Sequence, residues 1–184
     1  MEQPLRTERL LLRSLVPGDA EPLRRLAGDR AIADTMISVP HPFTQPHALE
    51  WIADYGGSAP KSRHRYFATC LDEIGDLVGI TALRDIDAEH AQAELSFWIG
   101  RPYWGRGFAS EAAGATLQYG FLMLHLNRIT AYHMLRNPAS ARVLVRLGFR
   151  QEGILRQRVR KWGVFEDVAA YAILRSEYYV THGC

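Results

Sequence analysis

The residues best suited to chemistry lie in the stretch R101-P-Y-W-G-R-G-F-A-S-E-A112, where two glycines flank one arginine. A predicted strand ends at Ile99 and a predicted long helix begins at Phe108, so the glycine turn leads from a strand into a helix N-terminus. The first N–H groups of a helix have no partner inside it, and the helix dipole adds positive potential there. Glycine allows close approach to the backbone, and Arg106 adds a positive charge. The turn therefore suits a phosphate or pyrophosphate group.

Two common nucleotide-binding motifs are excluded by the same residues. A P-loop requires the pattern G-x-x-x-x-G-K-[ST], and the chain has no such run. The dinucleotide pattern G-x-G-x-x-G requires a glycine where this chain has Ser110. Taken alone, the stretch is also compatible with a tight strand-to-helix connection that binds no ligand.

The elements that must position this turn are predicted from hydrophobic periodicity and capping signals. Asp19 is expected to cap one helix, and Leu49 and Ile52 to supply apolar residues of a second. Asn137 at the cap and Gly148 past the end mark a further short helix. Helices are predicted over about 20–27, 46–55, 108–126 and 138–147, strands over about 8–13, 65–71, 77–83, 91–99, 128–133, 150–160 and 166–174, no regular element in 29–44, and a loop over 56–63.

Length and composition indicate one domain spanning residues 1–184. The hydrophobic content is 47% and the charged content 23%, which are ordinary values for a soluble protein. Apolar runs are too short for a membrane span, and the N-terminus lacks the basic-then-apolar order of a signal peptide. The two cysteines are too few for a disulfide framework and fit a reducing cytosol, and no His/Cys cluster has metal-site spacing. We therefore expect a cytoplasmic protein with neither a membrane association nor a metal.

Charge is divided unevenly along the chain. Residues 1–92 carry 10 Lys/Arg and 14 Asp/Glu, a net charge of −4, whereas residues 93–184 carry 12 and 6, a net charge of +6. The C-terminal half therefore suits an anionic ligand and the N-terminal half a cationic one, with chance bias on a solvated surface as the alternative. No nucleic-acid motif accompanies the basic residues, so nucleic acid is not an expected partner.

Further short motifs agree, in order, with one enzyme family. W104-G-R-G-F-A109 resembles the pyrophosphate loop [RQ]-x-x-G-x-[GA] of the GCN5-related N-acetyltransferases, the GNAT superfamily, although Trp104 stands where the pattern has Arg or Gln. The tryptophan form resembles the branch of the RimJ/RimL-type ribosomal-protein N-terminal acetyltransferases. The same branch is matched by T7-E-R-L-L-L-R13, V39-P-H-P-F-T44, E94-L-S-F-W-I99, L126-N-R-I-T-A131, N137-P-A-S140, V145-R-L-G-F149, E152-G-I-L-R156 and G163-V-F-E-D-V168.

The resemblance implies an α/β (α+β) GNAT fold, with a mixed, mostly antiparallel seven-stranded sheet and about four flanking helices. Its fourth and fifth strands splay apart and leave a cleft for acetyl-CoA. The strand ending at Ile99 would pair with the pantetheine amides as an added strand would, and the glycine turn would bind the diphosphate. The expected acetyl-CoA residues are Phe97, Trp98, Ile99, Trp104, Gly105, Arg106, Gly107, Phe108, Ala109, Ser110, Asn137, Ser140 and Arg142.

Acetyl transfer needs a neutral amine and a proton for the departing thiolate, and this chain departs from the family in the residues for both. Many family members carry a tyrosine acid where this chain has Leu144, and the RimL type carries a glutamate where it has Val159. A serine three residues past the asparagine is the proposed acid of the RimL type, and Ser140 matches it. Glu94, on the strand beside the cleft, is the best remaining base, acting directly or through water. His133, on the neighbouring strand, is expected to be structural.

The pKa of the acceptor amine favours one acceptor class. A lysine pKa near 10.4 must fall by about 3.4 for the amine to be neutral at pH 7, whereas an α-amine pKa near 7.7–8.0 must fall by only about 1. A site with few catalytic groups therefore handles an α-amine more readily. We expect an acetyl-CoA-dependent N-acetyltransferase that acts on a primary amine, with a protein N-terminal α-amine as the leading acceptor.

Two other functions stay open on the sequence. One is acetylation of a small-molecule amine of the polyamine or aminoglycoside type. The other is a non-catalytic CoA-binding module, which the missing tyrosine and glutamate favour. The loop at 36–47 is expected to shape the acceptor pocket, but its sequence does not choose between acceptors. The oligomeric state, monomer or homodimer, is also open.

Overall fold

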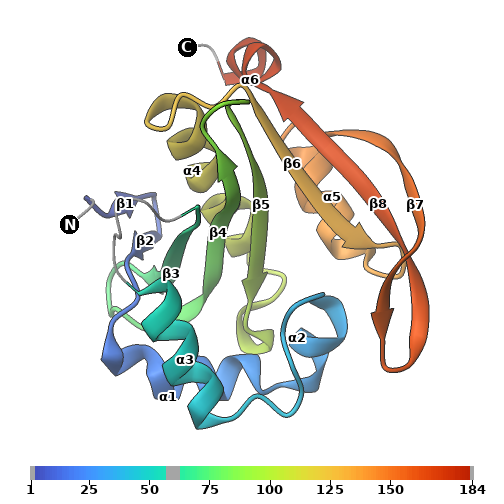
Figure 1. Cartoon of the computed structure of the whole chain (residues 1–184). Helices are drawn as coiled ribbons and strands as arrows, with labels where there is room; N and C mark the ends of the chain where they lie inside the picture. Colours follow the sequence, from blue (N-terminus) through green and yellow to red (C-terminus); the bar gives the residue numbers. More distant parts are fainter. Residues whose placement is uncertain (1–2, 57–62, 183–184) are drawn as a thin grey trace.

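The computed structural model describes residues 3–56 and 63–182, which form a mixed sheet with helices on both faces (Figure 1). Within these ranges, eight strands lie in the order β1-β2-β3-β4-β5-β6-β8-β7. Every neighbouring pair is antiparallel except β5 and β6, which are parallel. The mixed, mostly antiparallel sheet is therefore confirmed. The strands are β1 (Leu5–Arg6), β2 (Leu10–Arg13), β3 (Arg65–Leu71), β4 (Leu77–Asp87), β5 (Gln92–Ile99), β6 (Arg128–Met134), β7 (Arg150–Lys161) and β8 (Val164–Leu174).

The sheet has one strand more than the seven predicted, because the two-residue β1 pairs with β2. A strand of this length shows no alternation, so periodicity does not reveal it. The other seven strands lie at the predicted positions, with changes at their ends. The largest change is in β4, which continues to Asp87 through residues predicted as a turn.

Six α-helices, counted within the described ranges, flank the sheet where about four were predicted. The predicted helices are α1 (Ala20–Ala27), α3 (Gln45–Tyr55), α4 (Phe108–Leu122) and α5 (Pro138–Arg146), and the additional ones are α2 (Arg30–Thr35) and α6 (Arg175–His182). α4 ends at Leu122 rather than near residue 126, because His125 adopts a φ of 54° and the Leu126 N–H binds the Gly120 carbonyl.

The helices form two cores on opposite faces of the sheet. Residues of α4 and α5 pack against one face, and residues of α1, α2 and α3 pack against the other. Successive residues of β3 serve the two cores, since Phe67 belongs to the first and Ala68 to the second. Strands buried on both faces hold the loops at their ends firmly, and the glycine turn is one of these loops.

Two expectations about single residues were wrong. Asp19 makes no capping hydrogen bond to α1; its carboxylate instead accepts from Arg13 and from the Val16 N–H. Leu49 is 50% exposed, and α3 buries Ala48 and Ile52 in its place. Ion pairing outcompetes capping at Asp19, and the tertiary context sets the buried face of α3.

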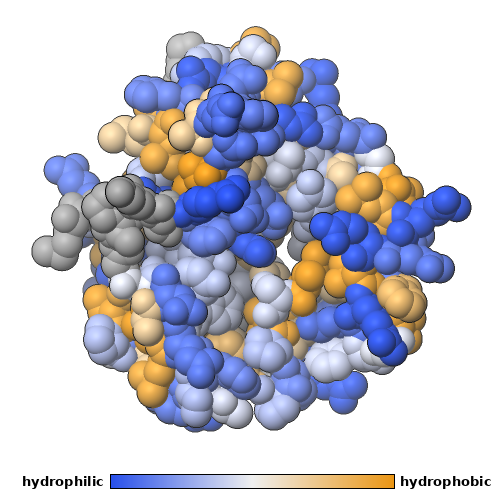
Figure 2. Space-filling model, in the orientation of Figure 1, coloured by the Kyte–Doolittle hydropathy of each residue, from blue (hydrophilic) through white to orange (hydrophobic). Residues whose placement is uncertain are grey.

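The two central strands separate as the resemblance implies. β5 and β6 pair only from Gln92 with Arg128 to Glu94 with Thr130, and beyond these pairs the ribbons diverge (Figure 1). They are the fifth and sixth strands here, because β1 adds one before them. The surface is hollowed between the diverging strands, in the middle of the view (Figure 2).

Across the described residues, no helix is long and apolar enough to cross a membrane. In the same residues no group of three His, Cys, Asp or Glu side chains could hold a metal ion. The loop predicted over 56–63 lies largely outside the residues that the structure describes.

Candidate functional site

A cavity of about 580 Å³ lies at the end of β5 and is bounded by the glycine turn, α5 and α2. We call it the main cavity. Every residue predicted to bind the cofactor lines it except Arg106, whose guanidinium lies over the Phe108 ring. The predicted residues in its lining are Phe97, Trp98, Ile99, Trp104, Gly105, Gly107, Phe108, Ala109, Ser110, Asn137, Ser140 and Arg142. Residues from three separate segments of the sequence therefore meet in one place, although their role in binding stays a prediction.

The glycine turn has the backbone that an anion site requires. Gly105 and Gly107 have φ values of 75° and 82°, in the left-handed region that glycine adopts without strain. Gly107 precedes the first residue of α4, and it makes no side-chain hydrogen bond to that helix. Within residues 3–56 and 63–182, the first N–H groups of α4 thus have no side-chain cap, and an anion in the main cavity would satisfy them.

Hydrogen bonds from Arg9 to Glu111 and to the glycine turn hold the turn in place. We call Arg9 and Glu111 the clasp. Glu111, in the first turn of α4, accepts hydrogen bonds from the Thr7 hydroxyl at 2.6 Å and from Arg9 Nε at 2.8 Å. Arg9 Nη1 donates to the Arg106 carbonyl at 3.0 Å. Burial opposes ionisation of Glu111, but the hydrogen bonds from Thr7 and Arg9 prevail and lower its pKa. An ionised Glu111 therefore fixes Arg9, and Arg9 fixes the turn.

The Trp104 side chain lines the main cavity and also makes a hydrogen bond within the protein. Its side chain is 47% exposed and lines the main cavity, while its indole N–H donates to the Ile99 carbonyl at 2.5 Å. On the side of β6, residues 95–99 of β5 have no strand partner in the described chain. The buried Trp98 Nε1 also lacks a hydrogen-bond partner among the described residues. Polar groups are therefore left unpaired along this wall of the cavity.

Asn137 and Ser140 form a small network at the start of α5. The Ser140 N–H donates to Asn137 Oδ1 at 3.3 Å, which caps the helix as predicted. Asn137 Nδ2 donates to Ser140 Oγ at 2.9 Å. Because the hydroxyl oxygen accepts from the amide, its own hydrogen stays available for another acceptor. The Ser140 hydroxyl can therefore donate a hydrogen bond, although its role as the acid stays a prediction.

A smaller pocket of about 50 Å³ adjoins the main cavity, and we call it the side pocket. Glu94, Arg84 and His133 line it, and Thr35, Met36, Phe97 and Ser140 line both spaces. The side chain of Glu94 is 27% exposed, and burial raises its pKa above the ordinary glutamate value, against the opposing charge of Arg84. The structure thus brings Glu94 and Ser140 to one pocket that opens on the main cavity.

The positions where family members carry other groups offer no chemistry. Leu144 is buried and lines the side pocket, so a hydrocarbon fills the place of the tyrosine. Val159 pairs with Glu166 in the β7–β8 hairpin and lines neither cavity. His133 is 6% exposed and packs on the Tyr171 ring at 5.4 Å, in agreement with its expected structural role, yet it also lines the side pocket.

Sequence reasoning missed several residues of the two spaces. Arg146 lines the main cavity one turn after Arg142 on α5, and that four-residue spacing could have revealed it. Ile32, Thr35 and Met36 come from α2 and its end, where no helix was predicted. Arg84 comes from β4, and no linear motif connects it with Glu94; only the register of β4 and β5 sets them opposite each other.

Comparisons with known proteins show which family the chain matches. Residues 9–150 match the family model of the acetyltransferase (GNAT) domain. The chain is similar to a Bacillus licheniformis protein named uncharacterized N-acetyltransferase p20, with 33% identity over 177 residues, 96% of this chain and 98% of that one. It is also similar to a Bacillus subtilis protein, provisionally named a ribosomal N-acetyltransferase, with 27% identity over 178 residues, 93% of this chain and 94% of that one.

A solved structure gives the same picture of the fold. The crystal structure of spermidine N-acetyltransferase from Vibrio cholerae, in complex with CoA and spermine, superposes with a TM-score of 0.82. The two chains share 26% identity, and the match covers 94% of this chain and 99% of that one.

Proposed function

The chain belongs to the GNAT family of acetyltransferases, and from this premise we propose that it transfers the acetyl group of acetyl-CoA to a primary α-amine. The observation that carries the proposal is the junction of the two spaces. Glu94 and Ser140 line one side pocket, and Ser140 also lines the main cavity. In this proposal Glu94 would accept a proton and Ser140 would donate one where the amine and the thioester meet.

The main cavity has the groups that acetyl-CoA requires. Uncapped N–H groups at the start of α4 suit the diphosphate, and the unpaired side of β5 suits the pantetheine amides. Arg142 and Arg146 add positive charge to the lining for the phosphates. Acetyl-CoA supplies the activated acetyl group, and the protein supplies its position and the proton transfers.

The side pocket supplies the proton acceptor. Because burial raises the pKa of Glu94, its carboxylate is a stronger base than an exposed glutamate and still ionises. Glu94 would remove a proton from the incoming ammonium or amine. Ser140 Oγ, which accepts from Asn137 and keeps its hydrogen, would donate to the departing thiolate.

The α-amine is favoured as acceptor by the small number of catalytic groups. Its ordinary pKa near 7.7–8.0 asks for a fall of about 1 to reach neutrality at pH 7, against about 3.4 for a lysine. The alternative acceptor is a polyamine, which is supported by the resemblance to a structure named spermidine N-acetyltransferase. The other alternative, a non-catalytic CoA-binding module, is favoured by the hydrocarbon at Leu144.

A screen of acceptors that follows release of the CoA thiol tests the proposal. N-terminal peptides, the same peptides with a blocked α-amine and a free lysine, polyamines and aminoglycosides are compared at equal concentration. We expect free α-amine peptides to give the highest kcat/KM. A higher kcat/KM on polyamines would favour the polyamine as the acceptor in place of the α-amine. Tight acetyl-CoA binding without thiol release in any arm would contradict catalysis altogether.

A further inference from the structure

Arg84 is a cation placed beside the proposed base, in the side pocket. It lies opposite Glu94 in the register of β4 and β5, and its Nη1 is 3.6 Å from Glu94 Oε1. That distance exceeds a hydrogen bond, so the guanidinium keeps its donors. The side chain is 29% exposed, and its buried Nε has no hydrogen-bond partner among the described residues. The terminal nitrogens of a guanidinium in a half-buried pocket can donate to an oxygen acceptor.

His133 offers the opposite kind of group to the same pocket. Its Nδ1 is 2.9 Å from the Met134 carbonyl, and since a carbonyl can only accept, Nδ1 carries the hydrogen. In the neutral ring Nε2 is then a bare acceptor, and in the described residues it has no partner although the side chain is 6% exposed. Among the described residues, the side pocket therefore brings together His133 Nε2, which has no hydrogen-bond partner, and the Glu94–Arg84 ion pair, whose two atoms are too far apart to form a hydrogen bond.

We propose that the side pocket binds an acceptor whose primary amine is adjacent to a carbonyl or carboxylate group, and that Arg84 recognises that oxygen. This inference rests on the proposed acetyl transfer and specifies its acceptor. The amine faces the carboxylate of Glu94, beside His133, and the neighbouring oxygen accepts from the guanidinium. Free amino acids and peptide N-termini both carry this arrangement of groups.

A polyamine fits this lining less well. Among the described residues, the side pocket is lined by one carboxylate, Glu94, and one guanidinium, Arg84, so it has no excess of negative charge. The next charged groups acting on Glu94 are Asp85 and Arg158, which oppose each other. A polyamine brings several cations and no oxygen, so it would repel Arg84 and leave its donors unpaired.

The test compares acceptors within one variant, using alanine, alaninamide, trialanine and spermidine. For each protein the ratio of kcat/KM on an α-amino carbonyl acceptor to kcat/KM on spermidine is measured. Removing Arg84 also changes the surroundings of Glu94, but that effect acts on every acceptor and cancels in the ratio. We expect Arg84→Met to lower this ratio by about 10- to 100-fold, the worth of a hydrogen bond to a charged group.

Two further variants separate recognition from folding. Arg84→Lys keeps the positive charge but loses the planar set of guanidinium donors. We therefore expect a kcat/KM ratio between those of the wild type and Arg84→Met. Arg128→Met is the matched control, because Arg128 has similar exposure, 31%, but pairs with Glu152 outside the side pocket. It should leave the ratio unchanged. The wild-type ratios for alanine against trialanine tell a free amino acid from a peptide N-terminus.

The outcomes that overturn this inference differ from those that overturn acetyl transfer. A wild-type preference for spermidine, or an equal loss on all four acceptors in Arg84→Met, would remove Arg84 as the specificity residue while leaving catalysis intact. Absence of thiol release with every acceptor would remove acetyl transfer itself. A kcat/KM ratio in Arg84→Met that equals the wild-type ratio would also contradict the inference.

Discussion

Gly107 is the residue on which the proposed binding of the diphosphate would depend most directly. With a φ of 82° it turns the chain into α4, and a glutamate there would place a carboxylate among the N–H groups that face the anion. We expect Gly107→Glu to abolish acetyl-CoA binding in calorimetry. Gly163→Glu is the matched control, because Gly163 has a φ of 83° in the turn of the β7–β8 hairpin. Each variant carries about 1–2 kcal/mol of backbone strain, but only the first should lose the ligand. Equal affinity in both would contradict the assignment of the turn.

Ser140 is expected to act on the rate more than on affinity. Its oxygen accepts from Asn137 Nδ2, which leaves the hydroxyl hydrogen free to donate. We expect Ser140→Ala to lower kcat by about 100-fold, the usual worth of a positioned acid, with little change in the dissociation constant of acetyl-CoA. Ser140→Cys retains a proton donor and should recover part of the rate. A kcat that equals the wild-type value in Ser140→Ala would reduce Ser140 to a helix residue.

Glu94 should give the reaction a characteristic pH dependence. Burial raises its pKa, so the side chain stays protonated, and unable to accept a proton, up to a higher pH than an ordinary glutamate. As pH falls through that raised pKa, we expect the wild-type kcat/KM to approach that of Glu94→Gln. The ratio of the two proteins cancels the titration of the acceptor amine. Glu152→Gln is the control, since Arg128 lowers the pKa of Glu152 outside both cavities. A ratio that does not change with pH would exclude Glu94 as the base.

The predictability of these residues follows from how local each signal is. The glycine turn and the asparagine cap are short runs in which sequence neighbours are also spatial neighbours, so spacing and capping chemistry sufficed for them. Arg84 and His133 reach the side pocket from strands far apart in sequence, and their exposure and hydrogen bonds depend on packing. No sequence pattern pointed to Arg84. His133 was predicted to be structural, but its position in the side pocket was not predicted.

At the scale of elements, the clasp between the start of β2 and α4 explains why the turn keeps its shape. Arg9 donates to Glu111 and to the Arg106 carbonyl, and a Cβ on Gly107 would lie 3.4 Å from Arg9 Nη2. The guanidinium also lies over the Phe108 ring at 4.8 Å. The anion site therefore depends on a segment about a hundred residues earlier in the chain.

Breaking this clasp should weaken binding of acetyl-CoA but spare a donor that lacks the diphosphate. We expect Arg9→Met to raise KM for acetyl-CoA by about tenfold, because the turn loses its charged hydrogen bonds, and to leave kcat/KM for acetyl-pantetheine unchanged. Arg6→Met is the matched control, since Arg6 pairs with Asp72 near the same strand and does not contact the turn. Parallel losses on both donors would mean that Arg9 only stabilises the fold.

Elements with strong boundary signals were the ones found from the sequence. α5 has Asn137, Pro138 and Gly148 as markers, and its bounds were close to those observed. α2 has six residues and only the Asp29 cap, whose carboxylate accepts from the Ala31 N–H, so no periodicity develops. Its absence from the expected elements matters for function, because the residues at its end line both spaces.

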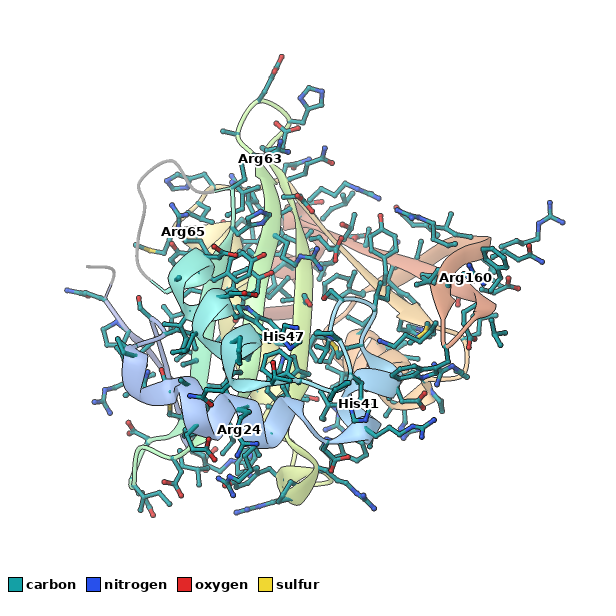
Figure 3. The ribbon with its side chains drawn as sticks, turned by 60° about the horizontal axis from the view of Figure 1, so that its bottom comes forward. Arg24, His41, His47, Arg63, Arg65 and Arg160 are labelled. Atoms are coloured by element: carbon teal, nitrogen blue, oxygen red, sulfur yellow. The ribbon has the colours of Figure 1, made fainter. Side chains whose placement is uncertain are left out.

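At the scale of the molecule, only some of the basic residues in the C-terminal half of the chain lie at the candidate site. Arg142 and Arg146 from the basic half line the main cavity. Arg160, from the same half, lies on the β7–β8 hairpin, far from Arg24 on α1, as Figure 3 shows. Its guanidinium lies over the Phe165 ring, not over a cavity. A charge count along the sequence indicates the sign of a ligand, and only the fold indicates which charges reach it.

The β7–β8 hairpin joins the two halves of the chain at the site. Lys161 is buried and donates to the Met36 carbonyl at 2.8 Å and to the Val39 carbonyl at 3.0 Å. Trp162 Nε1 donates to Asp34 at 2.7 Å. The hairpin of the C-terminal half therefore holds the segment after α2, which lines both the main cavity and the side pocket.

Loosening this connection should affect the acceptor more than the donor, because the side pocket takes Met36, Ile37 and Ser38 from this segment and the main cavity takes only Met36. Lys161→Met removes the donor to the part-buried Met36 carbonyl and to the buried Val39 carbonyl, which costs about 1–3 kcal/mol and frees the Met36 segment. We expect KM for the amine to rise about tenfold while the dissociation constant of acetyl-CoA rises much less, with faster hydrogen exchange in residues 36–40. Arg160→Met is the matched control, because it removes the same charge one residue away without touching that segment. If both variants behave alike, or if Lys161→Met weakens acetyl-CoA binding equally, the hairpin supports the fold in general and does not position the acceptor.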